Sequence, residues 1–215
     1  MQNTVTAEEL HKNVPSNWYY QSIRVDALQR YWHKRRFEEV SKVIEKTEGK
    51  ILDIGSNDGT FSKVILDKSG ARELTGIDVI KKAVDWANGH WRGSEMKFIV
   101  ADAHNLPFPD NSFNAVFALE MLEHVFDPLK VLTEARRVLK KGGYGVFLVP
   151  SDSPLFKIVW FLWLRFYPRG KIWRETHIQT YKGNFLPKLV KKAGFNIEAD
   201  RKFLFGMLHL VKGRK

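Results

Sequence analysis

The chain has 215 residues, of which 44% are hydrophobic and none is cysteine. This length and composition suit one α/β domain with a proper core, and they exclude a disordered chain, disulfides, thiolate metal sites and a cysteine nucleophile. The net charge of +11 is unevenly placed, because residues 1–128 carry 16 Lys or Arg against 19 Asp or Glu, whereas residues 129–215 carry 19 against 5. The basic half predicts either an anionic partner or a solvated, lysine-rich surface.

No targeting or membrane-spanning segment is expected. Residues 1–9 lack the basic and apolar parts of a signal peptide, and no apolar run reaches the roughly 18 residues that span a bilayer. The expected location is therefore cytoplasmic, with attachment to a membrane surface as an alternative.

Helical spacing of apolar residues begins after an N-terminal stretch of 23 residues that is expected to be irregular. One long helix or two joined helices are expected over 24–46, ended by Gly49. Strands are then expected over 50–54, 73–78, 97–101, 114–119 and 144–149, and helices over 60–68, 81–87, 128–139 and 185–193. After Pro150 the alternation breaks, and it ends in a strand pair over 195–203 and 207–211. Such alternation predicts a parallel, doubly wound sheet whose ligands bind beyond the carboxyl ends of the strands.

The chain is expected to form a single domain with four parts. They are an N-terminal helical cap (1–47), a cofactor-binding core (48–150), an aromatic lid or insertion (151–181), and a C-terminal helix with a strand pair (182–215).

The stretch 51–61, ILDIGSNDGTF, combines a buried strand, a glycine-rich turn and the start of a helix. This arrangement predicts that backbone N–H groups and a helix N-terminus face a nucleotide-like cofactor. Asp53, Asp78 and Asp102 each stand at or just after a strand end, so all three are expected in one crevice, where they can accept hydrogen bonds from ribose hydroxyls or an amine. One such Asp is equally well explained as a helix cap or turn residue, but three in register are not.

These motifs resemble those of the class I S-adenosylmethionine-dependent methyltransferases, in particular the small-molecule and lipid-type subgroup called methyltransferase type 11. The matching segments are ILDIGSNDG (51–59), LTGIDVI (74–80), FIVADAHNLPFPDNSFNAVFALEMLEHV (98–125) and ARRVLKKGGYGVFLVP (135–150), with a weaker match over 176–195. The resemblance implies a Rossmann-like, seven-stranded sheet of order 3-2-1-4-5-7-6, mostly parallel with an antiparallel last strand and helices on both faces. It also implies S-adenosyl-L-methionine as cofactor and S-adenosyl-L-homocysteine as product.

The resemblance assigns twelve positions to the cofactor: Asp53, Gly55, Ser56, Asn57, Gly59, Asp78, Val79, Ile80, Asp102, Ala103, Leu119 and Glu120. Asp78 would bind the ribose hydroxyls and Asp102 the adenine amine. The turn around the methionine part departs from the family, since Asn57 stands where a glycine is usual; Asn tolerates a positive φ, so the turn is expected to persist. NAD is the rival cofactor, but the G-x-G-x-x-G spacing is absent and Asp53 would crowd a pyrophosphate.

Two histidines are candidates for a catalytic role. The sulfonium is already a strong electrophile, so catalysis is mainly orientation, with a general base where the acceptor must lose a proton. His124 follows the fourth strand and His177 precedes the last helix. For both, a hydrogen-bonded structural histidine is the alternative. Glu123 and His124 lack a third ligand at a recognisable spacing, so no metal is expected.

The segment 155–167 holds six aromatic and two charged residues among thirteen. It is interpreted as a lid over the acceptor, an interfacial helix that contacts an anionic membrane through 155–174, or a dimer interface or core helix. Trp160 and Trp163, together with Tyr19 and Tyr20 of the cap, are expected to contact the acceptor.

The favoured function is methyl transfer, by in-line displacement, to a small hydrophobic or amphiphilic, even lipid-like, acceptor. The alternatives are an RNA methyltransferase that uses the basic half and a cofactor-binding partner protein without catalysis. Nucleic acid is the less favoured partner, because no separate RNA-binding module is present. The sequence leaves the oligomeric state open.

Overall fold

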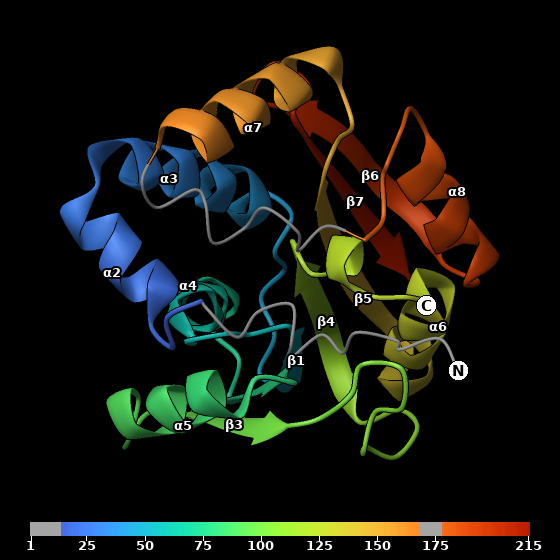
Figure 1. Cartoon of the computed structure of the whole chain (residues 1–215). Coiled ribbons are helices and arrows are strands. Elements are labelled where there is room, and N and C mark those ends of the chain that lie inside the picture. The colour runs from blue at the N-terminus through green and yellow to red at the C-terminus, as the bar shows by residue number, and fades with distance from the viewer. Residues whose placement is uncertain (1–13, 168–177) are drawn as a thin grey trace, which may run out of the picture.

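A seven-stranded sheet forms the centre of the protein, and helices cover both of its faces (Figure 1). The computed structural model describes residues 14–167 and 178–215. The strands are β1 (Lys50–Ile54), β2 (Glu73–Asp78), β3 (Met96–Val100), β4 (Phe113–Leu119), β5 (Leu139–Pro150), β6 (Asn196–Phe203) and β7 (Leu208–Arg214). They lie in the order β3-β2-β1-β4-β5-β7-β6, in which β7 runs antiparallel to both neighbours. The expected fold class and strand order are confirmed.

The sheet has a hydrophobic core on each face, because successive side chains of a strand point to opposite sides. Leu52 and Ile54 of β1 pack with α6 and α8 on one face. Ile51 of the same strand packs with α3, α4 and α5 on the other. The helices concerned are α3 (Ala27–Ser41), α4 (Thr60–Ser69), α5 (Lys81–His90), α6 (Pro128–Val138) and α8 (Phe185–Lys192). Parallel strands buried on both faces need continuous apolar runs, which explains why the sequence shows them.

The N-terminal part differs from the expectation in two ways. Helix α2 (Trp18–Val25) already begins inside the stretch that was expected to be irregular. The helical pattern then breaks at Asp26, whose extended backbone and side chain cap α3 by accepting a hydrogen bond from the Gln29 N–H at 3.0 Å. Two joined helices are therefore present. Helix α3 ends at Ser41, well before the expected end at Gly49, and the Lys42 N–H closes its last turn on the Glu39 and Val40 carbonyls.

The insertion after β5 forms helix α7 (Pro154–Phe166), which begins at a Ser153 cap that accepts from the Phe156 N–H at 3.1 Å. Within α7 only Phe156 is buried, so the interpretation as an ordinary core helix is wrong. Trp160 and Trp163 pack toward Trp18 at the start of α2. Helices α2, α3 and α7 thus lie together beyond the carboxyl ends of the central strands (Figure 1).

Candidate functional site

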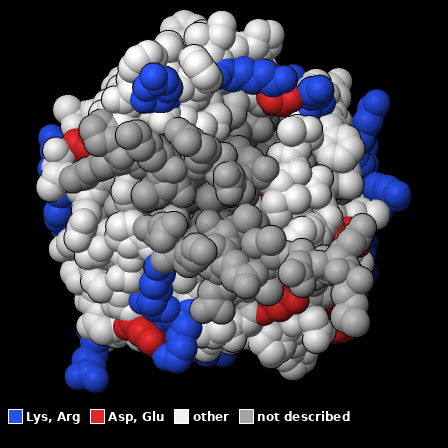
Figure 2. Space-filling view, in the orientation of Figure 1, with Lys and Arg blue, Asp and Glu red and all other residues white. Residues whose placement is uncertain are grey.

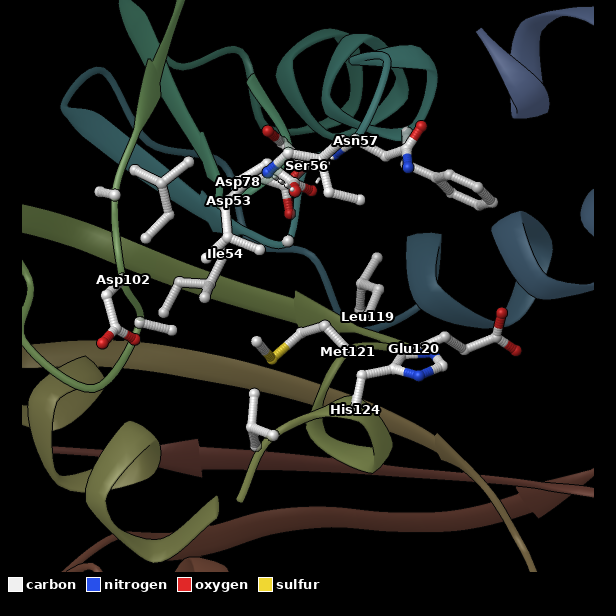
Figure 3. A pocket seen from close by; sticks show the side chains of 18 of the residues that line it. Asp53, Ile54, Ser56, Asn57, Asp78, Asp102, Leu119, Glu120, Met121 and His124 are labelled. Carbon is white, nitrogen blue, oxygen red and sulfur yellow. Dashed lines mark hydrogen bonds between the residues drawn. The ribbon is translucent and has the colours of Figure 1, made fainter. Parts of the chain in front are cut away.

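A cavity of about 130 Å³ opens where β1, β2 and β4 end, at the edge of the sheet where such folds bind ligands (Figure 3). Eleven of the twelve positions expected to contact a cofactor line it: Asp53, Gly55, Ser56, Asn57, Asp78, Val79, Ile80, Asp102, Ala103, Leu119 and Glu120. Gly59 does not. Gly59 instead lies against the rings of Phe98 and Trp91. A Cβ at this position would lie 2.5 Å from the Phe98 ring and 2.8 Å from the Trp91 ring, so only glycine fits.

The turn after β1 satisfies its own backbone donors. Gly55 and Ser56 both donate to the Ile77 carbonyl at 2.8 and 2.9 Å, and Asn57 N–H donates to the Asp78 carboxylate at 2.9 Å. The next three N–H groups, those of residues 58 to 60, bond to the Asn57 side chain, the Ser56 carbonyl and the Asp58 side chain. These six N–H groups are therefore bonded within the chain, while Gly59 is the N-cap residue of α4 and the Thr60 N–H donates to the Asp58 side chain at 3.0 Å. The expectation that the α4 N-terminus faces a ligand stays a prediction.

Two residues of this turn adopt the left-handed backbone that it requires. Asn57 has φ of 45°, so the expectation that it would keep the turn in place of glycine is confirmed. Gly55 has φ of 77°, and a Cβ at this position would lie 2.6 Å from the Cβ of Met121. Met121 follows β4 and faces the turn across the cavity (Figure 3). Gly55 is therefore required by both its backbone and its neighbour.

The cavity wall is acidic. Asp53 is 2% exposed, and its burial and the nearby Asp78 raise its pKa to about 7, although the Ser62 hydroxyl, which donates to it at 2.6 Å, works in the other direction. Asp78 accepts from the backbone N–H groups of Asn57 and Ile80, each at 2.9 Å. Asp102 lies at the rim. Partial burial opposes its ionisation, but hydrogen bonds from the backbone and ring of His104 outweigh this and lower its pKa.

This chemistry fits S-adenosylmethionine better than a dinucleotide. A pyrophosphate needs free N–H donors or cations, whereas all six N–H groups from Gly55 to Thr60 are used within the chain and carboxylates line the wall. Carboxylates suit a cationic sulfonium and amine and also ribose hydroxyls. The hydroxyl of Ser56 is buried without a hydrogen-bond partner within the described chain, so it is available to a bound ligand.

A second and larger cavity, of about 440 Å³, adjoins the first. Helices α2, α3 and α7 supply most of its wall, which is mainly apolar and aromatic: Trp18, Tyr19, Leu28, Trp32, Phe156, Val159, Trp160, Leu162, Trp163, Phe166 and Tyr167. We call it the apolar chamber. Three of the four residues expected to contact the acceptor line it. Tyr20 does not, because its ring packs against Trp86 and His90 of α5 at 5.2 and 4.4 Å.

Four residues line both cavities: Tyr19, Arg36, Glu120 and His124. Arg36 forms an ion pair with Glu120, and its guanidinium lies 4.2 Å from the ring centroid of Phe61. Burial raises the pKa of Glu120, although Arg36 opposes this. Glu120 has φ of 53°, a left-handed conformation that is uncommon away from glycine and is found at functional sites. His177, the other candidate base, lies outside the described residues.

Sequence reasoning overlooked Arg36, His33 and Glu123 as site residues. A signal was available for Arg36, which lies four residues after Trp32 and four before Val40, on the buried stripe of α3. A cation on the apolar face of a helix needs a buried partner. No such signal marks Glu123, because its depth depends on how the short helix η1 (Leu122–His124) folds after β4.

The basic residues of the described chain do not form one continuous patch on the face shown in Figure 2, where the Lys and Arg side chains are scattered. Some are paired with acids elsewhere, since Lys212 and Arg214 both bind Glu45 and Glu198. Arg137 likewise binds Glu134 and Asp110. These pairs give the basic half a structural use that does not require nucleic acid.

Comparison with known proteins agrees with the geometry. The model of the methyltransferase domain family matches residues 52–147. The chain is 32% identical over 187 residues to demethylmenaquinone methyltransferase of Thermotoga maritima, covering 80% of each chain. It is 33% identical over 197 residues to the ubiquinone/menaquinone biosynthesis C-methyltransferase of Desulfotalea psychrophila, covering 84% of this chain and 79% of that one. A solved S-adenosylmethionine-dependent methyltransferase of Methanosarcina mazei has a TM-score of 0.64 and 25% identity, covering 79% and 93%.

Proposed function

The chain belongs to the S-adenosylmethionine-dependent methyltransferases, and from this membership we propose that the acidic cavity holds the cofactor and the apolar chamber holds the methyl acceptor. The observation that carries the proposal is that the two cavities share Tyr19, Arg36, Glu120 and His124. A group bound in one cavity can therefore meet a group bound in the other without leaving the protein.

Asp53, Asp78 and Asp102 are proposed to hold the cofactor, which supplies a methyl group on a positively charged sulfur. Asp78 is fixed by two backbone N–H groups, so its carboxylate is preorganised to accept from ribose hydroxyls. Asp53 is placed to balance the positive charge of the methionine end. Orientation then provides most of the catalysis, because the residues shared by the two cavities direct the acceptor toward the methyl group and exclude water.

The acceptor is proposed to be small and hydrophobic or amphiphilic. The chamber wall is largely aromatic and aliphatic, and the names of the two relatives above place their substrates among the quinones. The RNA and non-catalytic alternatives have no observation of this kind in their favour. Where the acceptor must lose a proton, His124 is the proposed base, since its side chain lies on the wall shared by the two cavities.

We further propose that the acceptor enters from an anionic membrane surface. Leu28 of α3 and Leu162 and Phe166 of α7 line the chamber yet are largely exposed, so the chamber opens between exposed apolar side chains. Ile158 and Phe161 continue this surface along α7. Helices α2, α3 and α7 also carry exposed cations: Arg24, Arg30, Lys34, Lys157 and Arg165. Within the described residues, no helix is long and apolar enough to cross a bilayer.

Co-sedimentation with vesicles tests the membrane part. The protein should bind phosphatidylglycerol vesicles more tightly than phosphatidylcholine vesicles, and the double variant Ile158→Glu, Phe161→Glu should lose at least tenfold in binding. Phe185→Glu is the matched control. Phe185 is also an exposed aromatic residue, but it lies on α8, which covers the face of the sheet opposite to α3. Equal binding by all three proteins would remove the membrane from the proposal.

The methyl transfer itself is tested by release of S-adenosylhomocysteine from a panel of amphiphilic phenols, quinols and amines. Trp160→Ala should raise the acceptor KM by about tenfold and leave the cofactor KM unchanged, because Trp160 lines only the apolar chamber. Asp78→Asn should raise the cofactor KM and leave the acceptor KM unchanged. If both variants changed only the cofactor KM, the assignment of the chamber to the acceptor would be wrong.

A further inference from the structure

A cluster of three buried polar side chains lines the apolar chamber, and one of them also lines the first cavity. His33 and Arg36 come from α3, Glu123 comes from η1, and all three line the apolar chamber. Their side chains are almost inaccessible to water, with exposed fractions of 2%, 3% and 2%. Each polar atom in such a place needs a partner inside the cavity or within the protein.

Several atoms of this cluster have no such partner within the described chain. They are both ring nitrogens of His33, Nε of Arg36 and Oε2 of Glu123, and Nε1 of Trp163 on α7 is also unpaired. Leaving a buried polar atom unpaired costs roughly 1–3 kcal/mol. Because four such residues line one chamber, their unpaired atoms point to a ligand that supplies the missing hydrogen bonds.

Burial disfavours charge on this cluster. Burial and the nearby Glu120 raise the pKa of Glu123 well above its ordinary value and so favour the protonated carboxyl. Burial and Arg36 hold the pKa of His33 well below its ordinary value, so the imidazole is neutral. The positive charge of Arg36 is balanced by Glu120, to which it is bonded. His33, Glu123 and Trp163 therefore offer uncharged donors, together with the second imidazole nitrogen of His33 as an acceptor.

Resting on the proposed function, we propose that His33 and Glu123 select an acceptor with an uncharged head group that carries a hydroxyl or carbonyl oxygen. The carboxylic acid of Glu123 donates to that oxygen, and the imidazole of His33 exchanges a second hydrogen bond with the head. The apolar body of the acceptor lies along Trp160 and Trp163 of α7. A carboxylate or ammonium head would be buried among groups that carry no balancing charge, and this excludes it.

Binding of three probes with the same chain length tests the charge of the head. The probes are 4-hexylphenol, 4-hexylbenzoate and N,N,N-trimethyl-4-hexylanilinium, each added with S-adenosylhomocysteine at saturation. Tryptophan fluorescence reports their binding. The unaltered protein should bind the phenol at least tenfold more tightly than either charged probe. Equal or tighter binding of a charged probe would overturn the inference without any variant having to fold.

Two variants test the residues. Glu123→Met and His33→Leu should weaken 4-hexylphenol binding about tenfold and leave hexylbenzene binding unchanged. His33→Leu should leave the melting temperature equal or higher, because neither ring nitrogen has a partner to lose, and Glu123→Met should change it little, because Oε2 has none. Glu123→Gln should restore most of the phenol binding, since an amide also donates. Val159→Ala is the matched control in the same chamber and should weaken both probes alike.

The outcomes separate the inference from the proposed function. Binding of both phenol and hexylbenzene, with no difference between the two and no effect of Glu123→Met, would overturn the head-group inference but leave the chamber as the acceptor site. Binding of neither probe while S-adenosylhomocysteine still binds would overturn the assignment of the chamber itself, and the inference with it. A large fall in melting temperature in both variants would instead assign the cluster a structural role.

Discussion

At the scale of single residues, the burial of Asp53 lowers the stability of the free protein, and this carboxylate is proposed to balance the positive charge of the cofactor. Its folded-state pKa of about 7 lies above the ordinary value of 3.8, so the native state holds the proton more tightly than the unfolded chain. From this group, stability is therefore lost as pH rises from about 4 to 7, and the loss is constant above that. A positively charged ligand favours the ionised form, so cofactor affinity should fall as pH drops below 7.

The variant Asp53→Asn tests both effects. Without cofactor at pH 8 it should be more stable than the unaltered protein, by about 1–3 kcal/mol in denaturant unfolding, because no buried charge remains. It should bind S-adenosylmethionine at least tenfold more weakly, with an affinity that no longer changes between pH 6 and 8 in calorimetry. Asp67→Asn, at an exposed position of α4, is the control. Parallel pH profiles for the unaltered protein and Asp53→Asn would contradict this account.

Gly55 carries a second prediction at this scale. Gly55→Ala should place a Cβ 2.6 Å from that of Met121 in a left-handed backbone, whereas Gly93→Ala meets the same backbone strain, at φ of 81°, with no atom within 4 Å. Gly93→Ala should therefore cost about 1–2 kcal/mol from strain alone. Gly55→Ala should cost several kcal/mol and weaken cofactor binding by a hundredfold or more. Equal losses of stability and unchanged cofactor binding in both variants would show that Met121 yields easily.

At the scale of helices and strands, the α2–α3 junction determines where the chamber wall lies. Asp26 caps α3 and so fixes the start of the helix that carries His33 and Arg36. Asp127 caps α6 in the same way, by accepting from the Lys130 N–H at 2.9 Å, but α6 contributes no residue to either cavity. The two caps are therefore a matched pair.

Asp26→Ala and Asp127→Ala should each cost about 1 kcal/mol of stability in thermal or chemical unfolding. Only Asp26→Ala should also raise the acceptor KM, by about fivefold, since only that helix carries chamber residues. If both variants had the same acceptor KM, Asp26 would stabilise α3 without positioning the side chains of that helix.

The sequence predicted some of these elements better than others, for a physical reason. Strands buried on both faces must be apolar throughout, so β1, β2 and β4 were found to within a residue at each end. The start of α2 was missed, because its aromatic residues Trp18 and Tyr19 pack against α7 and the α4 side of the sheet, and local spacing does not report such contacts. The order of the strands came from resemblance to a family and could not come from spacing.

The site residues divide in the same way, into those that a local motif predicts and those that depend on contacts in the folded chain. Positions set by the turn and strand ends, such as Asp53, Asp78 and Leu119, could be placed from the motif alone. The acceptor wall could be placed only in part, since Trp160 and Trp163 were marked by an unusual aromatic segment. His33 and Glu123 were not marked, because their role depends on two elements that meet only in the folded chain.

At the scale of the whole molecule, an ion-pair network joins the N-terminal and C-terminal parts. Glu45, after α3, binds Lys212 and Arg214 of β7, which also bind Glu198 of β6. Hydrogen bonds from Arg214 and Lys212 lower the pKa of Glu45 to about 2 against the opposing effect of partial burial, and that of Glu198 is lowered by the same partners. Because these folded-state pKa values are depressed, the stability that they confer is present above about pH 4.5 and is lost as pH falls toward 2.

Glu45→Gln should therefore destabilise the protein at pH 7 by less than about 1 kcal/mol, because the side chain is 40% exposed and its ion pairs are screened by water. The difference from the unaltered protein should vanish near pH 2 and shrink at 1 M salt in urea unfolding. A difference that is independent of both pH and salt would assign the effect to packing.

The closed hydrogen bonding of the turn after β1 also has a kinetic consequence. Since every N–H from Gly55 to Thr60 already has a partner in the free chain, little backbone disorder remains to be lost when a ligand arrives. Hydrogen–deuterium exchange of these amides should be slow in the free protein and change little on saturation with S-adenosylhomocysteine. The cofactor would then meet a rigid receptor, and its association rate would be limited by diffusion to the cavity mouth rather than by a loop that must first fold.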